Sequence, residues 1–274
     1  MILKIGHTPD TDDAFMYYAL LHNKINLQSL QFEDSLEPIS NLNSKANSGF
    51  YDISAFSAGY IPHISDKYDL LTAGACMADN HGPLLIKRKN ASGNRIAVPG
   101  LNTSAYAVMR LHDPDADCVE VPFDRILEYV INGTVDGGIL ISEDQMRIPA
   151  NHLTATDLGD WWKTETGYPL PLGVDAIRSA LPDNTKQLFC TIFRRSIEYA
   201  LNYPEEALKY AIQFGRGISA KSAEVFVKRF VNPYTVNLGE TGKQAIAVFL
   251  EKLYEARLCP SHVKITFIEG AQRQ

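Results

Sequence analysis

Hydrophobic positions in the first third of the chain follow two spacings in turn. Short apolar or alternating runs at Leu3–Ile5, Leu30–Glu33 and Asp52–Phe56 predict strands. Apolar residues recur three or four positions apart in Leu36–Ala46, and Ala14–Leu21 is rich in aliphatic and aromatic residues, so both segments are predicted to be helices. This repeated strand–helix–strand order is typical of a mostly parallel sheet with helices on both faces.

The middle of the chain continues this pattern and then repeats it. Further strands are predicted at Leu70–Ala75, Leu84–Lys87, Arg95–Gly100, Cys118–Val121 and Asp136–Ile141, and helices at Thr103–Leu111, Asp124–Ile131 and Asp157–Thr166. Tyr168–Gly173, which contains two prolines, is predicted to be an extended connector. The rest of the chain is predicted to be almost entirely helical, with long helices ending near Tyr203, Val231 and Ala256.

This order predicts an α/β fold of two lobes with a discontinuous first domain. Residues 1–95 and 175–274 are expected to form the larger lobe, and residues 96–174 a smaller inserted lobe. The C-terminal helices would return to cover the larger lobe. Ligands of open α/β sheets bind at the carboxyl ends of the strands, so a ligand cleft is expected between the lobes.

Composition and charge narrow the range of partners. Apolar residues make up 45% of the chain and charged residues 21%, which is usual for a globular protein. Twenty-six basic against 32 acidic residues give a net charge of −6, which opposes a nucleic-acid partner. No run of 18 apolar residues occurs and the N-terminus does not resemble a signal peptide, so we expect no membrane contact and a cytoplasmic protein. The oligomeric state stays open, with a homodimer among the options.

Metal and cofactor motifs are not found in the sequence. The four cysteines lie far apart without a CxxC pair, and the histidines lack the spacing of metal ligands. Phosphate-binding glycine motifs and nucleophile elbows are also missing. We therefore expect neither a metal nor an organic cofactor.

Acidic residues crowd the turn between the first strand and the first helix. His7 is followed within six positions by Asp10, Asp12 and Asp13. Thr11 or Asp12 is predicted to cap the helix, but capping needs only one acid, so a ligand-facing role for another is equally open.

Two further strand ends carry small hydroxyl residues that open a helix. Ser54–Gly59 and Asn102–Ala105 each follow a predicted strand, one in each lobe. Hydroxyls and free amides at a helix N-terminus bind a carboxylate or phosphate well, although capping is the better explanation for either segment taken alone. Because both are predicted to open toward one cleft, they indicate an anion clamp. Ser142, Glu143 and Asp144 follow the buried strand that ends at Ile141, so they too are expected at the cleft.

Several segments together resemble the 1,4-dihydroxy-6-naphthoate synthase family of the futalosine route to menaquinone. The resemblance spans about Leu3 to Ala256, and its tryptophan and PLPLG segments set it apart from the sister chorismate dehydratases. It is carried by Thr8–Leu20, Val98–Gly100, Thr103–Tyr106, Phe123–Leu127, Asp157–Trp162 and Pro169–Gly173.

The resemblance implies a fold like that of type II periplasmic binding proteins and a cytoplasmic carbon–carbon lyase. The implied substrate is cyclic dehypoxanthine futalosine, which carries an aromatic carboxylate. Residues implied to line the ligand cleft are Asp13, Ala55, Phe56, Ser57, Thr103 and Ser104.

One position departs from the family pattern. The family places its general-base histidine, followed by glutamate, where this chain has Ser142 and Glu143. A serine hydroxyl is not basic near neutral pH, and loss of a general base costs about 10²–10⁴-fold in rate. Glu143, Asp13 or a histidine of the cleft could take the proton instead. Alternatively, the chain is a non-catalytic carboxylate-binding protein, or a repurposed relative with another aromatic substrate.

Overall fold

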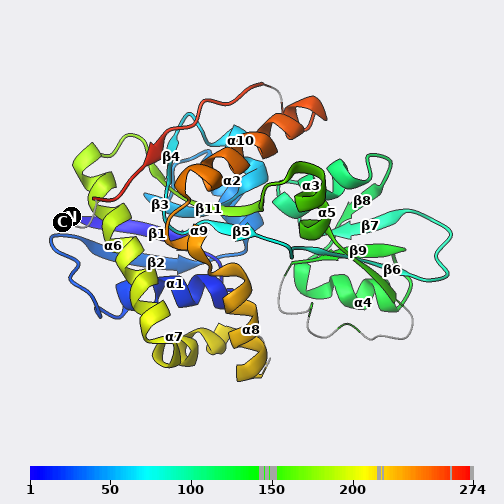
Figure 1. The fold of residues 1–274 in the computed structure, drawn as a ribbon, viewed down its shortest axis with the longest axis horizontal. Coiled ribbons are helices and arrows are strands. Elements are labelled where there is room, and N and C mark those ends of the chain that lie inside the picture. The colour runs from blue at the N-terminus through cyan, green and yellow to red at the C-terminus, as the bar shows by residue number, and fades with distance from the viewer. Residues whose placement is uncertain are drawn as a thin grey trace.

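A computed structural model gives the fold of this chain. It describes residues 1–141, 145, 148, 153–214, 217, 219–259 and 261–271. Two lobes lie side by side, each built on its own sheet, and the colours in Figure 1 show that the second lobe uses the middle of the chain. The two-lobed α/β architecture predicted from the sequence is confirmed.

The first sheet has seven strands within the described residues, in the order β12-β4-β11-β3-β1-β2 with β5 beside β11. Its strands are β1 (Ile2–His7), β2 (Gln31–Leu36), β3 (Ile53–Ser57), β4 (Tyr68–Leu71), β5 (Cys76–Ala78), β11 (Leu170–Arg178) and β12 (Phe267–Ile268). Strand β1 pairs in parallel with β2 and β3, whereas β11 runs antiparallel to β3, β4 and β5. The segment predicted as an extended connector thus enters β11, which brings the chain back to the first sheet.

The second sheet has the order β10-β6-β9-β7-β8. Its strands are β6 (Leu84–Arg88), β7 (Arg95–Val98), β8 (Asp117–Glu120), β9 (Gly137–Leu140) and β10 (Leu153–Asp157), and its helices are α3 (Ser104–His112), α4 (Ile126–Ile131) and α5 (Leu158–Thr166). Strand β6 pairs with β9 in this sheet although it precedes the predicted boundary at residues 95 and 96. The division into domains remains a prediction, but the chain changes sheets earlier, between β5 and β6. Strands β5 and β10 were not predicted.

Helices of the first lobe come from both ends of the chain. They are α1 (Thr11–Leu21), α2 (Ile39–Ala46), α6 (Asp183–Asn202), α7 (Pro204–Ala211), α8 (Ala220–Phe230), α9 (Pro233–Val236) and α10 (Gly239–Glu255). Helix α1 packs against α6 and α7, and it begins after Asp10 rather than at the predicted caps Thr11 or Asp12. The predicted helical C-terminal cover is confirmed. No helix in the described part of the chain combines the length and the hydrophobicity needed to span a bilayer.

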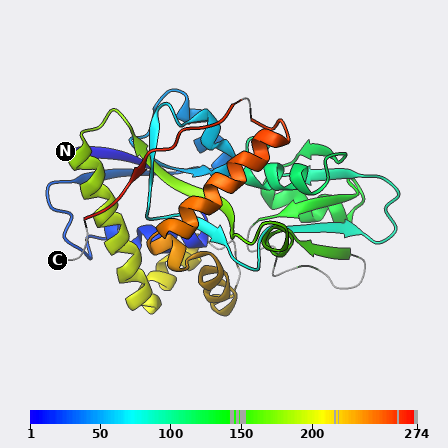
Figure 2. The same cartoon turned by 45° about the horizontal axis from the view of Figure 1, so that its top comes forward.

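Helix α10 crosses from the first lobe to the second, as the orange helix in Figure 2 shows. It packs against β11 and against α3. Phe249 of α10 meets the buried Trp162 of α5 edge to face, with ring centroids 5.4 Å apart. This shared apolar cluster fixes the two lobes against each other.

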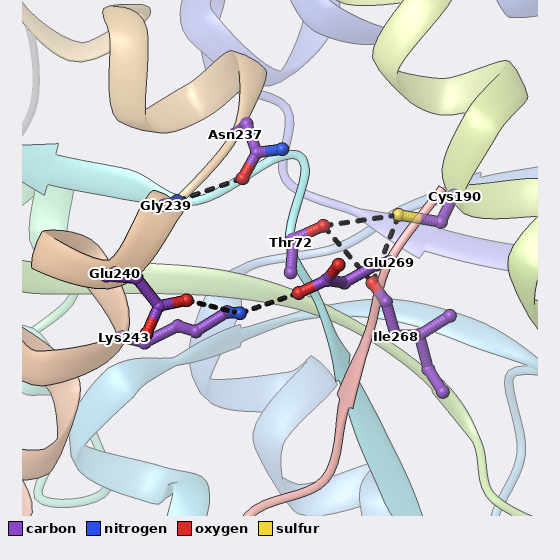
Figure 3. A network of polar contacts seen from close by, with 8 residues as sticks. All are labelled: Thr72, Cys190, Asn237, Gly239, Glu240, Lys243, Ile268 and Glu269. Carbon is purple, nitrogen blue, oxygen red and sulfur yellow. Dashed lines mark hydrogen bonds and ion pairs between the residues drawn. The ribbon is translucent and has the colours of Figure 1, made fainter. Parts of the chain in front are cut away.

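The C-terminal strand is held in place by the network of polar contacts in Figure 3. The carbonyl oxygen of Ile268 accepts hydrogen bonds from Thr72 Oγ1 at 3.2 Å and from Cys190 Sγ at 3.2 Å. Lys243 of α10 pairs with Glu240 at 3.0 Å and with Glu269 at 2.6 Å. These contacts join β12 to β4, α6 and α10, and so anchor the cover.

Candidate functional site

A cavity of about 120 Å³ lies where the two lobes meet. Six of the predicted site residues line it: Asp13, Ala55, Phe56, Ser57, Thr103 and Ser104. Residues 55–57 of the first lobe and 103–105 of the second therefore border one shared space. Ser142 and Glu143 lie outside the described residues, although Ile141, directly before them, lines the same cavity.

Asn43 sets the orientation of Ser57 at the first-lobe side of the cavity. Ser57 ends β3 and precedes the short 3₁₀ helix η1 (Ala58–His63). Its backbone N–H donates to Asn43 Oδ1 at 3.0 Å, and its hydroxyl accepts from Asn43 Nδ2 at 3.1 Å. Asn43 Nδ2 also donates to the carbonyl oxygen of Asn102 at 2.8 Å, so this one fully buried amide joins both lobes beside the site.

The hydroxyls of Thr103 and Ser104 are used within the protein. Thr103 caps α3: its Oγ1 donates to the Gly100 carbonyl oxygen at 2.6 Å and accepts from the backbone N–H of Tyr106 at 3.3 Å. Ser104 Oγ donates to the Leu172 carbonyl oxygen at 2.6 Å. Both hydroxyls therefore shape the site, and the donors that α3 can offer a ligand are the backbone N–H groups of its first turn.

Gly59 brings the two lobes into direct contact at this point. Its backbone N–H donates to Ser104 Oγ at 3.0 Å. A Cβ at position 59 would lie 3.1 Å from the Cβ of Ala107 and 3.3 Å from the Cα of Ser104. The close approach leaves the Ser57 hydroxyl and the N-terminus of α3 together at one end of the cavity, where a carboxylate could accept from both.

Asp13 lies on another wall of the cavity, in the first turn of α1. Its Oδ2 accepts from both the backbone N–H and the hydroxyl of Thr8, each at 2.8 Å. Burial raises the pKa of Asp13 to about 6, while the two Thr8 hydrogen bonds act in the opposite direction and nearby Asp10 adds to the rise. Asp13 therefore titrates close to neutral pH, which suits a general base.

Asp175 of β11 is a further carboxyl group at the cavity, and the sequence pattern did not predict it. It is 2% exposed, and its Oδ1 accepts a 2.6 Å hydrogen bond from the Tyr17 hydroxyl. Burial, and then the negative charge of Asp13, raise the pKa of Asp175 well above its ordinary value, and the bond from Tyr17 only partly opposes this. A charged residue inside the apolar run of β11 was the one sequence feature that could have indicated it.

His7 completes this buried polar group behind the cavity wall. Its ring stacks on Tyr17 with centroids 4.5 Å apart, and its Nδ1 lies 3.1 Å from the Thr8 carbonyl oxygen. Burial lowers the pKa of His7 to about 4, so the ring is neutral near pH 7. Nδ1 then carries the proton, because a carbonyl oxygen can only accept.

Apolar side chains cover the remaining walls. Phe226 and Phe230 of α8 face the cavity together with Ile39, Pro83, Ile141, Leu172 and Val174. Asp10 and Asp12 also line the cavity, so together with Asp13 and Asp175 four carboxyl groups of the described chain border it. An anion-binding end and aromatic walls form a site suited to an aromatic ring that carries a carboxylate. No group of three His, Cys, Asp or Glu side chains that could hold a metal ion occurs among the described residues.

Comparison with solved structures identifies the class of protein that this fold defines. The periplasmic aliphatic sulphonate binding protein of Escherichia coli is 12% identical, with a TM-score of 0.65 over 100% of this chain and 95% of that protein. The chain thus has the two-lobed fold of periplasmic binding proteins. A solved protein from Archaeoglobus fulgidus is more similar, with a TM-score of 0.90 and 38% identity over 94% of this chain and 98% of that one.

The family follows from the sequence comparisons. The family model for menaquinone biosynthesis matches residues 3–255. The 1,4-dihydroxy-6-naphthoate synthase of Thermus thermophilus is 34% identical over 94% of this chain and 97% of its own length. The chain belongs to the menaquinone biosynthesis family.

Proposed function

We propose that this protein is a cytoplasmic lyase that acts as a 1,4-dihydroxy-6-naphthoate synthase on cyclic dehypoxanthine futalosine. The observation that carries the proposal is the shared cavity, in which Ser57 of one lobe and the first turn of α3 of the other border the same space as Asp13. Family membership supports the reaction class, and the aromatic walls support the substrate class. The reaction needs neither a metal nor an organic cofactor in this proposal.

The substrate carboxylate would accept hydrogen bonds from Ser57 and from the N–H groups that begin α3. Negative charge is stabilised there because those amides point outward at the positive end of the helix dipole. The aromatic ring would lie against Phe226 and Phe230. Proton abstraction and elimination would then take place near Asp13, in a site from which the closed lobes exclude water.

A second candidate function rests on Ser142, which stands where the family has its general-base histidine. A protein without a base would bind an aromatic carboxylate and release it unchanged, or act on a related substrate that needs no imidazole.

The deciding experiment is incubation of the purified protein with cyclic dehypoxanthine futalosine, followed by absorbance of the naphthoate product. Product formation supports the lyase. Tight binding without product, together with turnover gained in Ser142→His, would favour the binding protein. If the substrate does not bind and Ser142→His gains nothing, the proposed substrate is wrong.

A further inference from the structure

Asp175 lies at a junction of three segments that are distant in the sequence. It is in the middle of β11, between β3 and β4 in the sheet, and it receives the hydroxyl of Tyr17 from α1. Tyr17 is itself fully buried and stacks between His7 and Phe193, with 4.5 Å between ring centroids on both sides. The tyrosine therefore has little freedom to move, and it fixes Oδ1 of Asp175.

Gly74 lies close to the other oxygen of Asp175. A Cβ at position 74 would lie only 2.4 Å from Asp175 Oδ2, and Gly74 has a φ of +93° that disfavours any side chain. Gly74 and Asp175 both line the cavity. The glycine leaves the space that Oδ2 needs at the cavity wall.

The titratable groups that line the cavity with Asp175, or pack behind it, are acidic or neutral. Asp10, Asp12 and Asp13 come from the start of α1, and Cys76 comes from β5. Burial, and then these carboxylates, raise the pKa of the Cys76 thiol well above its ordinary value, so the thiol is neutral. Tyr17 is neutral for the same reason, since burial raises its pKa. His7, behind Tyr17, is neutral because burial lowers its pKa to about 4.

Among the four carboxyl groups of the described chain that line the cavity, Asp13 and Asp175 differ in their hydrogen bonds and in their burial, and such differences separate the protonation states of two carboxyl groups. Asp13 accepts two hydrogen bonds from Thr8, which stabilise its ionised form. Asp175 accepts one from Tyr17 and is the more deeply buried of the two. Resting on the lyase function proposed above, we propose that Asp13 is the proton acceptor of the reaction and that Asp175, positioned by Tyr17, is its proton donor.

The proton and electron balance of this step closes without a further reactant. Asp13 takes a proton from the substrate, and the electron pair of that bond forms the new double bond. The bond to the leaving group then breaks, and its electron pair stays with the leaving group. The leaving group takes the proton of Asp175. Asp13 gains one proton and Asp175 loses one, so the total charge of the two carboxyl groups is unchanged. A transfer from Asp13 to Asp175 restores the starting state, and nothing is oxidised or reduced.

This assignment explains how a chain with Ser142 at the family's base position can still turn over its substrate. The base is then Asp13, a carboxylate of the first lobe that Thr8 holds in place. Tyr17 holds the proton donor Asp175 in the same way.

Infrared spectroscopy tests the protonation state without relying on activity. The carbonyl stretch of a neutral carboxylic acid should be present near neutral pH in the wild type and lost in Asp175→Asn. Asn is isosteric, and its Oδ1 can still accept from Tyr17, so the variant is expected to fold. Asp69→Asn is the matched control: Asp69 is also buried in this sheet but is ion-paired with Lys186 at 2.6 Å, so its loss should leave the band unchanged. Lys186 keeps its pair with Asp183 in that variant.

Turnover tests the catalytic role. Asp175→Asn and Asp13→Asn should each lower the rate about 10²–10⁴-fold, whereas benzoate, used as a carboxylate probe, should bind within a few-fold of the wild type. Tyr17→Phe should shift the infrared band and lower turnover less, as expected of a positioning residue. A band that persists in Asp175→Asn, or full turnover in that variant, would overturn the proposal. A wild type that shows the band but forms no product would overturn the proposed substrate and still support a neutral Asp175.

Discussion

The hydroxyl of Tyr17 donates a 2.6 Å hydrogen bond to Oδ1 of Asp175, across 158 positions of the sequence. The bond joins the buried face of α1 to β11, the strand that returns the chain from the second lobe to the first. Its free energy depends on the protonation state of Asp175, so the stability of the fold is linked to pH.

Asp175→Asn should become more stable relative to the wild type as the pH rises, because it lacks the ionisable group at position 175. The unfolded carboxyl loses its proton near its ordinary pKa of 3.8, whereas the folded one keeps it because its pKa is raised. The free energy of unfolding of the wild type should therefore fall by about 1.4 kcal/mol per pH unit above that value, until the folded pKa is reached. Asp175→Asn lacks this loss. Denaturant unfolding at several pH values measures it, and parallel curves for the two proteins would contradict the prediction.

His7 should have the opposite effect in acid. Between pH 6.5 and about 4 the unfolded imidazole gains a proton that the buried ring cannot take, so stability is lost as the pH falls through this window. The loss should reach about 3 kcal/mol. His7→Phe keeps an aromatic ring stacked on Tyr17 and should remove most of this loss. The same unfolding series measures it, and an unchanged acid dependence in His7→Phe would show that another group is responsible.

Asn43→Ala should weaken both the fold and carboxylate binding. The substitution removes two buried hydrogen bonds to Ser57 and a partly buried one to Asn102, and it leaves the N–H of Ser57 without its partner. A buried unsatisfied group costs about 1–3 kcal/mol. Thermal unfolding and a benzoate titration measure the two effects. Asn41→Ala, an exposed position in the same helix, is the control and should be nearly neutral. Equal effects of the two variants would rule out the bridging role of Asn43.

Gly159 should not tolerate a side chain. A Cβ there would lie 2.0 Å from the carbonyl oxygen of His81 and 2.8 Å from the N of Gly82, both backbone atoms where the chain crosses between the lobes. Gly159→Ala should destabilise the protein by about 1–3 kcal/mol, because the backbone must shift. Gly173→Ala, whose Cβ would have no contact closer than 3.6 Å, is the control in thermal unfolding. A Gly159→Ala protein as stable as its control would contradict the close approach.

Local patterns in the sequence were enough for much of the architecture. Apolar spacing, apolar composition and capping residues predicted α1, α2 and the long C-terminal helices, and the hydroxyl residues at 103 and 104 predicted the start of α3. These features depend on neighbours within about one turn or one strand, where periodicity and capping act. The same local chemistry predicted that Ser57 and Thr103 would open toward one cleft.

Pairings between distant segments had no such local basis. Strand β6 joins the second sheet and β11 inserts between β3 and β4, because strand partners are chosen by which faces can be buried together. Asp175 became part of the site through that insertion alone, and the pKa values of Asp175 and His7 follow from burial that only the assembled lobes provide. The sequence by itself thus determined most of the helices and strands and the two helix starts that border the cavity. The tertiary structure decided which carboxyl groups face them and in which charge state, since desolvation is a property of the packed protein.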